Sequence, residues 1–153
     1  MHISAVDDSS SLLPISDIQS TLFPGTGEVS TTVVQVVPLS ECLRPSQIEK
    51  PALLKLDVQG YELEGLKGCE GLLEHFEHIY AECSFIELYE EQALAGMIIA
   101  WLGERSFLLR GVHNLVYNPE GRPVQGDFLF AHRRLPNVVG PSDLTSTNYR
   151  GSP

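Results

Sequence analysis

The sequence predicts an α/β fold with parallel strands in the middle of its sheet. Two observations lead to this prediction. Short apolar runs with the composition of strands are twice followed by stretches in which apolar residues recur every three or four positions, as on one face of a helix. A series of strand-like segments then closes the pattern. The 153 residues, 42% of them hydrophobic and 8% aromatic, have the length and composition of one globular domain.

The first third of the chain is expected to hold little regular structure. Residues 1–27 are rich in Ser, Asp, Pro and Gly and show no sustained period, so we interpret them as a loop that leads into the domain. Residues 28–37 are dense in Val and Thr, which is typical of a strand. Residues 39–43 fit one helical turn between two prolines. The apolar run at 52–58 then predicts a buried parallel strand.

Two helices and a strand are expected in the centre of the chain. The helical spacing of apolar residues over 61–76 predicts a helix with one buried face. The segment 78–83 is a second short strand. Ser84 and Glu87 fit a capping box, which predicts that the next helix opens there. Its apolar positions continue from Leu94 to Leu102, and Gly103 is a suitable stop.

The remaining strands lie near the end of the domain. Strand candidates are 107–110, 115–117 and 127–131, with a turn at 118–121 between two of them. Beyond His132 the chain becomes rich in Pro, Ser, Thr and Asn. We therefore place the domain at 1–134 and expect a loose tail over 135–153.

The charge balance excludes several classes of partner. Ten Lys and Arg against twenty Asp and Glu give a formal net charge of −10. Binding to nucleic-acid phosphates or to an anionic membrane surface relies on Lys and Arg, so neither partner is expected. The N-terminus has no basic region followed by a long apolar run, and no apolar stretch is long enough to cross a bilayer. A cytoplasmic location is the default expectation.

Neither a metal site nor a cysteine nucleophile is predicted. Cys42, Cys69 and Cys83 form no CxxC pair, have no neighbouring His, and are interpreted as small buried hydrophobes. His75 and His78 are three positions apart, but they straddle the predicted helix end, and no other His or Cys adds a suitable ligand spacing.

Two carboxylates follow the predicted parallel strands and are the candidate catalytic residues. Ligands of open α/β sheets bind beyond the carboxyl ends of the strands, where Asp57 and Glu82 are expected. Either could accept a proton from a substrate hydroxyl or bind polar groups of a cofactor. The alternatives are that Asp57 is an N-cap or turn acid for the following helix and that Glu82 is an exposed acid at a strand end.

The run from Leu54 to Gly68, LKLDVQGYELEGLKG, resembles the signature of FkbM-type methyltransferases, usually K-I-D-V-E-G-x-E-L-x-V-L-K-G. Gln59 stands where the family usually has Glu. Further segments resemble the family in the expected order. Ser9 to Leu13 resembles its Ser-Ser-Leu loop, and 34–43 its strand followed by "LDdl". Glu82 to Phe85, with Leu88 and Tyr89, resembles the end of its next strand, and Asp127 to Phe130 its closing strand.

This resemblance implies a Rossmann-like fold that binds S-adenosylmethionine and methylates a hydroxyl of a sugar or small metabolite. The resemblance implies that Asp57 and Glu82 are catalytic. It also implies that the cofactor is bound by Ser10, Ser11, Asp57, Gln59 and Gly60.

The resemblance covers about residues 5–132 and only the C-terminal half of the family's domain. We therefore expect strands four to seven of a seven-stranded sheet ordered 3-2-1-4-5-7-6, without the N-terminal cofactor-binding half. One hypothesis is a truncated methyltransferase, completed at the open edge of its sheet by the missing half or by a second copy of the chain. The other is a non-catalytic remnant, or an interaction module that pairs through the exposed edge.

Overall fold

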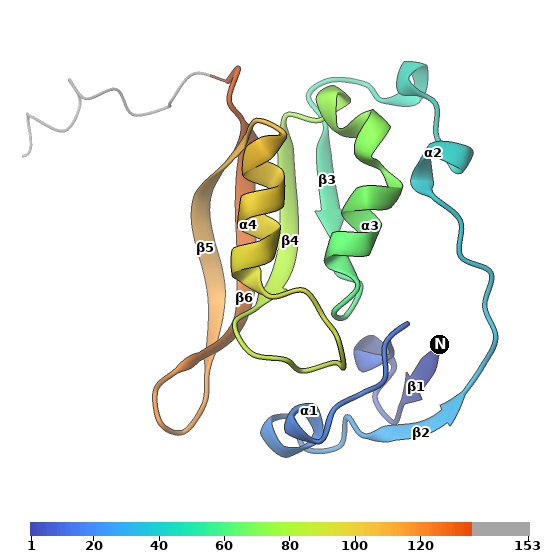
Figure 1. The fold of residues 1–153 in the computed structure, drawn as a ribbon, viewed down its shortest axis with the longest axis vertical. Coiled ribbons are helices and arrows are strands. Elements are labelled where there is room, and N and C mark those ends of the chain that lie inside the picture. Colours follow the sequence, from blue (N-terminus) through green and yellow to red (C-terminus); the bar gives the residue numbers. More distant parts are fainter. Residues whose placement is uncertain (136–153) are drawn as a thin grey trace, which may run out of the picture.

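The computed structural model describes residues 1–135, and its largest element is a four-stranded sheet. The strands β3 (Leu53–Leu56), β4 (His78–Ser84), β5 (Phe107–Tyr117) and β6 (Pro123–His132) lie in the order β3-β4-β6-β5 (Figure 1). β3 and β4 run parallel, whereas β6 is antiparallel to both of its neighbours. This sheet confirms the prediction of an α/β fold with a parallel pair of strands.

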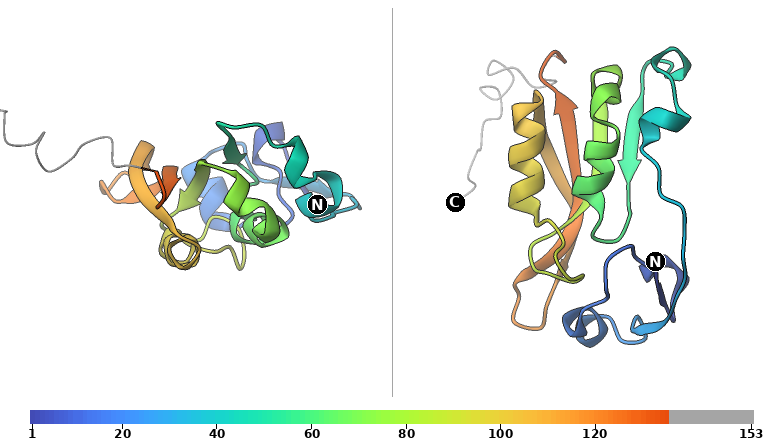
Figure 2. Two further views of the ribbon diagram at one scale, coloured as in Figure 1. Left: turned by 90° about the horizontal axis from the view of Figure 1, so that it is seen from above. Right: turned by 45° about the vertical axis from the view of Figure 1, so that its right-hand side comes forward.

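Two helices cover one face of this sheet (Figures 1 and 2). α3 (Glu62–Gly68) follows β3, and α4 (Ala95–Glu104) follows β4. Along β4 the alternate residues Ile79, Ala81 and Cys83 are buried, because every second side chain of a strand points to the same face. The residues between them, Glu82 included, therefore point to the opposite face.

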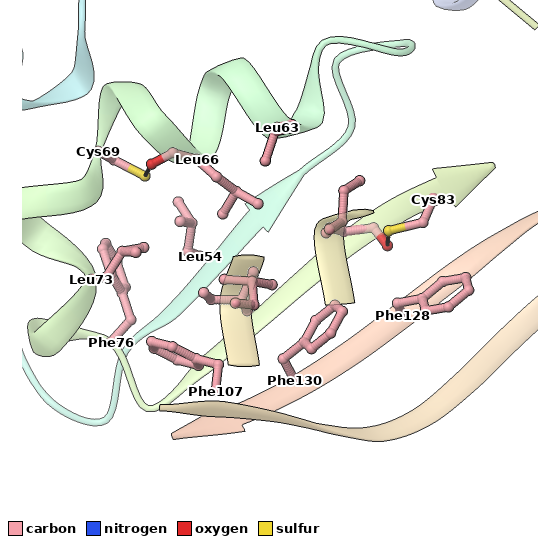
Figure 3. Close-up of a cluster of buried hydrophobic side chains, with 14 of the residues drawn as sticks. Leu54, Leu63, Leu66, Cys69, Leu73, Phe76, Cys83, Phe107, Phe128 and Phe130 are labelled. Carbon is pink, nitrogen blue, oxygen red and sulfur yellow. Dashed lines mark hydrogen bonds between the residues drawn. The ribbon is translucent and has the colours of Figure 1, made fainter. Parts of the chain in front are cut away.

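The main core lies between these helices and the sheet (Figure 3). β6 contributes Phe128 and Phe130, whose rings stack with their centroids 6.4 Å apart, and β5 contributes Phe107. The helices and β4 supply the aliphatic part, which includes Leu63, Leu66, Ile79, Ile98 and Leu102. Burial of these side chains is the dominant stabilising contribution to the sheet and helices.

The N-terminal segment, defined here as residues 1–27, lies beyond the carboxyl ends of β3 and β4 (Figure 1). It contains β1 (His2–Ser4), a 3₁₀ turn at Asp7–Ser9 and the short helix α1 (Asp17–Leu22). β1 pairs with β2 (Glu28–Thr31) in a separate two-stranded sheet. The prediction of a loop over 1–27 misses these elements, because they are too short to produce a hydrophobic period.

The N-terminal segment is attached to the loop that follows β4. The backbone N–H of Ser16 donates to the carbonyl of Leu88 at 3.1 Å, and that of Glu90 donates to the carbonyl of Pro14 at 2.9 Å. A small second cluster joins the two pieces, with Leu88, Tyr89 and Val124 at its centre and Leu13, Ile15, Leu22 and Phe23 packed around them. These contacts hold α1 in place next to the sheet.

Three sequence predictions differ in detail from the structure. The strand expected over 28–37 is formed only at β2, because the valines after it find no strand to pair with among the described residues. The helix expected over 61–76 ends at Gly68 and continues as a 3₁₀ helix, Glu70–His75. The single turn expected at 39–43 is present as α2 (Leu39–Cys42), followed by a 3₁₀ turn at Pro45–Gln47.

The predicted helix start at Ser84 is wrong. Ser84 ends β4, and α4 begins only at Ala95. Glu87 instead accepts a hydrogen bond from the backbone N–H of Glu91 at 2.6 Å, so the carboxylate stabilises a loop. The strand candidates 107–110 and 115–117 are parts of one strand, β5, and the expected turn at 118–121 connects it to β6.

The predicted tail, 135–153, lies outside the described residues from Pro136 onward. Within the described part, none of the helices has the length and apolar character needed to cross a membrane.

Candidate functional site

The parallel pairing of β3 and β4 brings the two candidate carboxylates to one edge of the sheet. Leu56 lies opposite Ala81, so Asp57 and Glu82 follow at neighbouring positions. They line a pocket of about 380 Å³, called here the strand-end pocket, together with Gln59 and Gln125. The N-terminal segment supplies the other lining residues: Val6, Asp8, Ser9, Gln19, Phe23 and Thr26.

The turn after β3 is fixed by a buried carboxylate. Gln59 and Gly60 both have positive φ angles, +50° and +90°. Glu62, which is only 2% exposed, accepts hydrogen bonds from the backbone N–H groups of Val58 at 3.1 Å and Gly60 at 3.3 Å. Burial raises the pKa of Glu62, and these two donors oppose the rise. Glu62 therefore shapes the turn from below and does not line the pocket.

Gln59 connects the two candidate carboxylates. Its Nε2 lies 2.8 Å from Oδ1 of Asp57 and 3.4 Å from Oε2 of Glu82, and its Oε1 accepts a hydrogen bond from the Tyr89 hydroxyl at 2.7 Å. A neutral amide can donate to carboxylates, whereas the Glu usual in the family signature would add a third negative charge here. Gln59 therefore allows Asp57 and Glu82 to lie close together.

Glu82 has the electrostatic environment of a general base. Burial raises its pKa to about 7, and the carboxylates of Asp57, Glu62 and Asp127 contribute in the same direction. Oε1 accepts a hydrogen bond from Nε2 of Gln125 at 2.9 Å, which orients the carboxyl group. A group with a pKa near the working pH can both take up and release a proton, which is the requirement for acid–base catalysis.

Asp57 differs from Glu82 in exposure and partners. Its side chain is 44% exposed, and Oδ2 pairs with Nζ of Lys55 at 2.8 Å. It makes no hydrogen bond to the start of α3 among the described contacts, and Tyr61, not Asp57, precedes that helix. Asp57 is therefore not the N-cap of α3, whereas its hydrogen bond from Nε2 of Gln59 agrees with the alternative of a turn acid.

Comparison with known proteins identifies the family. The family model described as "Methyltransferase FkbM domain" matches residues 1–109. The chain belongs to this family. No curated protein and no solved structure matches the chain.

The FkbM resemblance found in the sequence is thereby confirmed, and the match includes the N-terminal segment, β3, β4 and the turn between β3 and α3. Members of the family are methyltransferases, so the coarse function that follows is methyl transfer.

The two serines expected to bind a cofactor lie beside the strand-end pocket but do not line it. Ser11 is buried, and its hydroxyl donates to the carbonyl of Gln59 at 2.5 Å. Ser10 accepts a hydrogen bond from the backbone N–H of Ser4 at 3.1 Å. Both serines thus support the N-terminal segment and the 57–60 turn. Gly60 also supports the turn, because its backbone packs closely against the side chain of Tyr89.

Three residues at this site were given no role by the sequence analysis. Gln19, Tyr89 and Gln125 come from three segments that the fold brings together, and none of them stands at a predicted strand end. Tyr89 is the most connected of the three, because its hydroxyl also lies 3.2 Å from the carbonyl of Ser9.

Metal ligands and cysteines, both considered in the sequence analysis, are not part of this site. The described residues contain no cluster of three or more His, Cys, Asp or Glu that could hold a metal ion. Cys69 and Cys83 are buried and burial raises the pKa of each thiol, whereas Cys42 is exposed. The reading as small buried hydrophobes therefore holds for Cys69 and Cys83 and is wrong for Cys42.

The raised pKa of Glu82 predicts that the contribution of this residue to the free energy of unfolding falls as pH rises from about 4.5 to 7. In this window the folded chain keeps a proton that the unfolded chain has released, so deprotonation favours unfolding. We expect Glu82 to cost about 1–3 kcal/mol of unfolding free energy above pH 7, allowing for partial exposure. Urea unfolding at pH 5 and pH 8 should show that Glu82→Gln is more stable than wild type only at pH 8.

The matched control for this measurement is Glu64→Gln, which changes an exposed carboxylate on α3 paired with Lys67. Its difference from wild type should be nearly the same at both pH values. An equal difference at pH 5 and pH 8 for Glu82→Gln would contradict the raised pKa.

Gly60→Ala is expected to destabilise the turn that carries the site. A Cβ at this position would lie 2.9 Å from Cδ2 of Tyr89, and the φ of +90° is unfavourable for any residue with a side chain. We expect a loss of about 1–3 kcal/mol, measured by urea unfolding. Gly96→Ala in α4, where a Cβ meets nothing within 4 Å, is the control and should be neutral or stabilising. A neutral Gly60→Ala would show that the turn can rearrange.

Proposed function

We propose that the chain acts in S-adenosylmethionine-dependent O-methyl transfer to a hydroxyl of a sugar or small metabolite, with the strand-end pocket as the reaction site. The observation that carries this proposal is Glu82. It combines a pKa of about 7 with a position at the carboxyl end of a parallel strand, in a chain of the FkbM methyltransferase family. A base of this kind suits removal of a hydroxyl proton near neutral pH.

The strand order supports assignment of the sheet within a methyltransferase fold. In a seven-stranded sheet ordered 3-2-1-4-5-7-6, the last four strands lie in the order 4-5-7-6. The order β3-β4-β6-β5, with β6 antiparallel to its neighbours, has the same pattern. We therefore assign β3, β4, β5 and β6 to strands four, five, six and seven.

The pocket residues fit one part of S-adenosylmethionine. The cofactor carries a positively charged sulfonium, and the carboxylates of Asp57, Glu82 and Asp8 line the pocket. Opposite charges at close range attract each other, most strongly where water is partly excluded. When bound, the cofactor supplies an electrophilic methyl group attached to sulfur. Asp57, oriented by Lys55 and Gln59, is the residue assigned to hold this positive group.

Glu82 then serves the acceptor. Its carboxylate takes the proton of the acceptor hydroxyl, and Gln59 and Gln125 keep its two oxygens oriented through Nε2 donors at 3.4 and 2.9 Å. The loop that follows β4 and the N-terminal segment hold the acceptor close to the carboxylates of Asp57 and Glu82. Such positioning is a large part of the rate enhancement of a displacement reaction.

Calorimetric titration of the 153-residue chain with S-adenosylmethionine tests the proposal. We expect micromolar binding that Asp57→Asn weakens and Glu64→Gln leaves unchanged. A folded chain that binds no cofactor at millimolar concentration would overturn catalysis by the chain alone.

A second candidate function is an interaction module that uses the edge of β3. Among the described strands, β3 pairs only with β4, and Leu53 on this edge is 54% exposed. Unpaired N–H and C=O groups on such an edge can bind a further strand. Cofactor titration separates the two candidates, because a pure interaction module binds no S-adenosylmethionine. Sedimentation measurements across a range of concentrations would reveal pairing with a second copy.

A further inference from the structure

Gln19 is a buried polar residue that the mechanism above does not use. It lies on α1, lines the strand-end pocket and is only 5% exposed. Its backbone is fully engaged: the N–H donates to the Ser16 hydroxyl at 3.3 Å, and the carbonyl accepts from Phe23 at 2.8 Å. Its side-chain Oε1 is buried and makes no hydrogen bond with the described residues.

A buried carbonyl oxygen without a partner destabilises the folded chain, so its retention needs an explanation. Apolar neighbours on α1 and in the second cluster already hold this helix in place, and Gln19 is not needed for that contact. Gln19 lines the strand-end pocket, so a shift of its side chain toward the cavity would bring Oε1 within reach of a bound molecule. A hydrogen-bond donor on a bound molecule would then satisfy it.

The pocket around Gln19 presents acceptors and negative charge. Three of its lining residues, Asp8, Asp57 and Glu82, are carboxylic acids. None of the described residues that line it is a lysine, arginine or histidine. A phosphate or carboxylate placed among these three side chains would meet repulsion, because the nearest cation, Nζ of Lys55, already pairs with Asp57 at 2.8 Å. Hydroxyl and ammonium groups placed there find acceptors.

We propose that Gln19 is a specificity-determining residue of the strand-end pocket. Its Oε1 accepts a hydrogen bond from a hydroxyl or ammonium group of the ligand. The ligand is a polyhydroxyl compound that carries no phosphate or carboxylate. This inference rests on the proposed function and narrows its acceptor class. Neutral sugars and amino sugars belong to this class, and sugar phosphates and uronic acids do not.

Ligand-observed NMR on the full chain, without any cofactor, tests this inference. The probes are D-glucosamine, D-glucose and D-glucose 6-phosphate, which share a ring and differ in charge. We expect D-glucosamine to bind at least about tenfold more tightly than D-glucose 6-phosphate, with D-glucose between them. Gln19→Met removes the amide at similar length and should weaken D-glucosamine binding about tenfold.

Stability measurements guard against a trivial loss of binding. The midpoint of urea unfolding of Gln19→Met should equal or exceed that of wild type, because an unpartnered oxygen is removed. Ile18→Met on the exposed side of α1 is the matched control and should bind as wild type does. Gln19→Glu is a second variant, which keeps an acceptor and should retain D-glucosamine binding while weakening that of D-glucose 6-phosphate further.

Three results would overturn the inference. These are absence of binding of all probes at 50 mM concentration (about the weak limit of the method), binding of D-glucose 6-phosphate equal to that of D-glucosamine, or unchanged D-glucosamine binding in Gln19→Met. Because no cofactor is present, these results are independent of the titration with S-adenosylmethionine. Failure of that titration alone would refute methyl transfer by this chain and leave the sugar site standing.

Discussion

Glu82→Gln is expected to lower kcat for methyl transfer by roughly 100- to 10,000-fold, the usual contribution of a positioned general base. The amide keeps the size of the side chain but cannot take up a proton. Transfer of labelled methyl from S-adenosylmethionine to an acceptor found by screening measures the effect. In the wild type, activity should rise with pH through about 7, as Glu82 loses its proton, and the variant should lack this rise.

Two controls make this result specific. Glu64→Gln should leave kcat unchanged, because its carboxylate is exposed on α3 and pairs with Lys67. Binding of S-adenosylmethionine to Glu82→Gln should remain close to wild type, since Asp57 is the residue assigned to the cofactor. A variant that retains full kcat and the same pH profile would rule out Glu82 as the base and make Asp57 the next candidate.

Phe130→Ala is expected to reduce the unfolding free energy by about 3–5 kcal/mol. Phe130 is completely buried on β6, between the two strands with which β6 pairs, and its ring stacks on Phe128. Truncation leaves a cavity under α4 that the rigid sheet cannot fill. Because domains of this size are stable by only about 5–15 kcal/mol, the variant would lose a large part of its total stability. Urea unfolding at pH 6 measures the change.

Tyr117→Ala is the matched control for this change, since it also removes an aromatic ring. Its side chain is 56% exposed at the end of β5, so we expect a change within about 0.5 kcal/mol. Phe130→Leu keeps much of the volume and should lie between the two. Equal losses for Phe130→Ala and Tyr117→Ala would show that the stability of the chain does not depend on this core.

The elements that the sequence predicts well are those that contribute side chains to the main core, although β3, expected to be buried, buries only Leu54. β3 and β4 are short apolar runs, and the apolar spacing from Leu94 to Leu102 marks α4, because burial on one face imposes a period on the residues. Elements at the periphery are predicted poorly. α1 has six residues and depends on the Ser16 cap and on contacts with the loop after β4. The pairing of Ser84 with Glu87 imitates a helix start, but tertiary contacts extend β4 through Ser84.

Some residues of the candidate site can be predicted from the sequence, and others cannot. Asp57 and Glu82 can be predicted, because topology alone puts the residues after two adjacent parallel strands at one edge. The places of Gln19 and Gln125 in the pocket, and the contact of Tyr89 with Gln59, cannot be predicted. They depend on contacts between residues far apart in the sequence. The raised pKa of Glu82 could not be predicted from the sequence, because it depends on burial and on three neighbouring carboxylates.

The way in which the N-terminal segment is attached would allow one wall of the pocket to detach from the sheet. Six of its ten lining residues belong to this segment, which docks through a few hydrogen bonds and the small second cluster and contributes none of the buried main-core residues. Weakly docked units can detach while the rest of a fold stays intact. Each undocking would dismantle half of the pocket, so the measured affinity for any ligand would equal the intrinsic affinity multiplied by the docked fraction. Ligand and segment would consequently reinforce each other's binding.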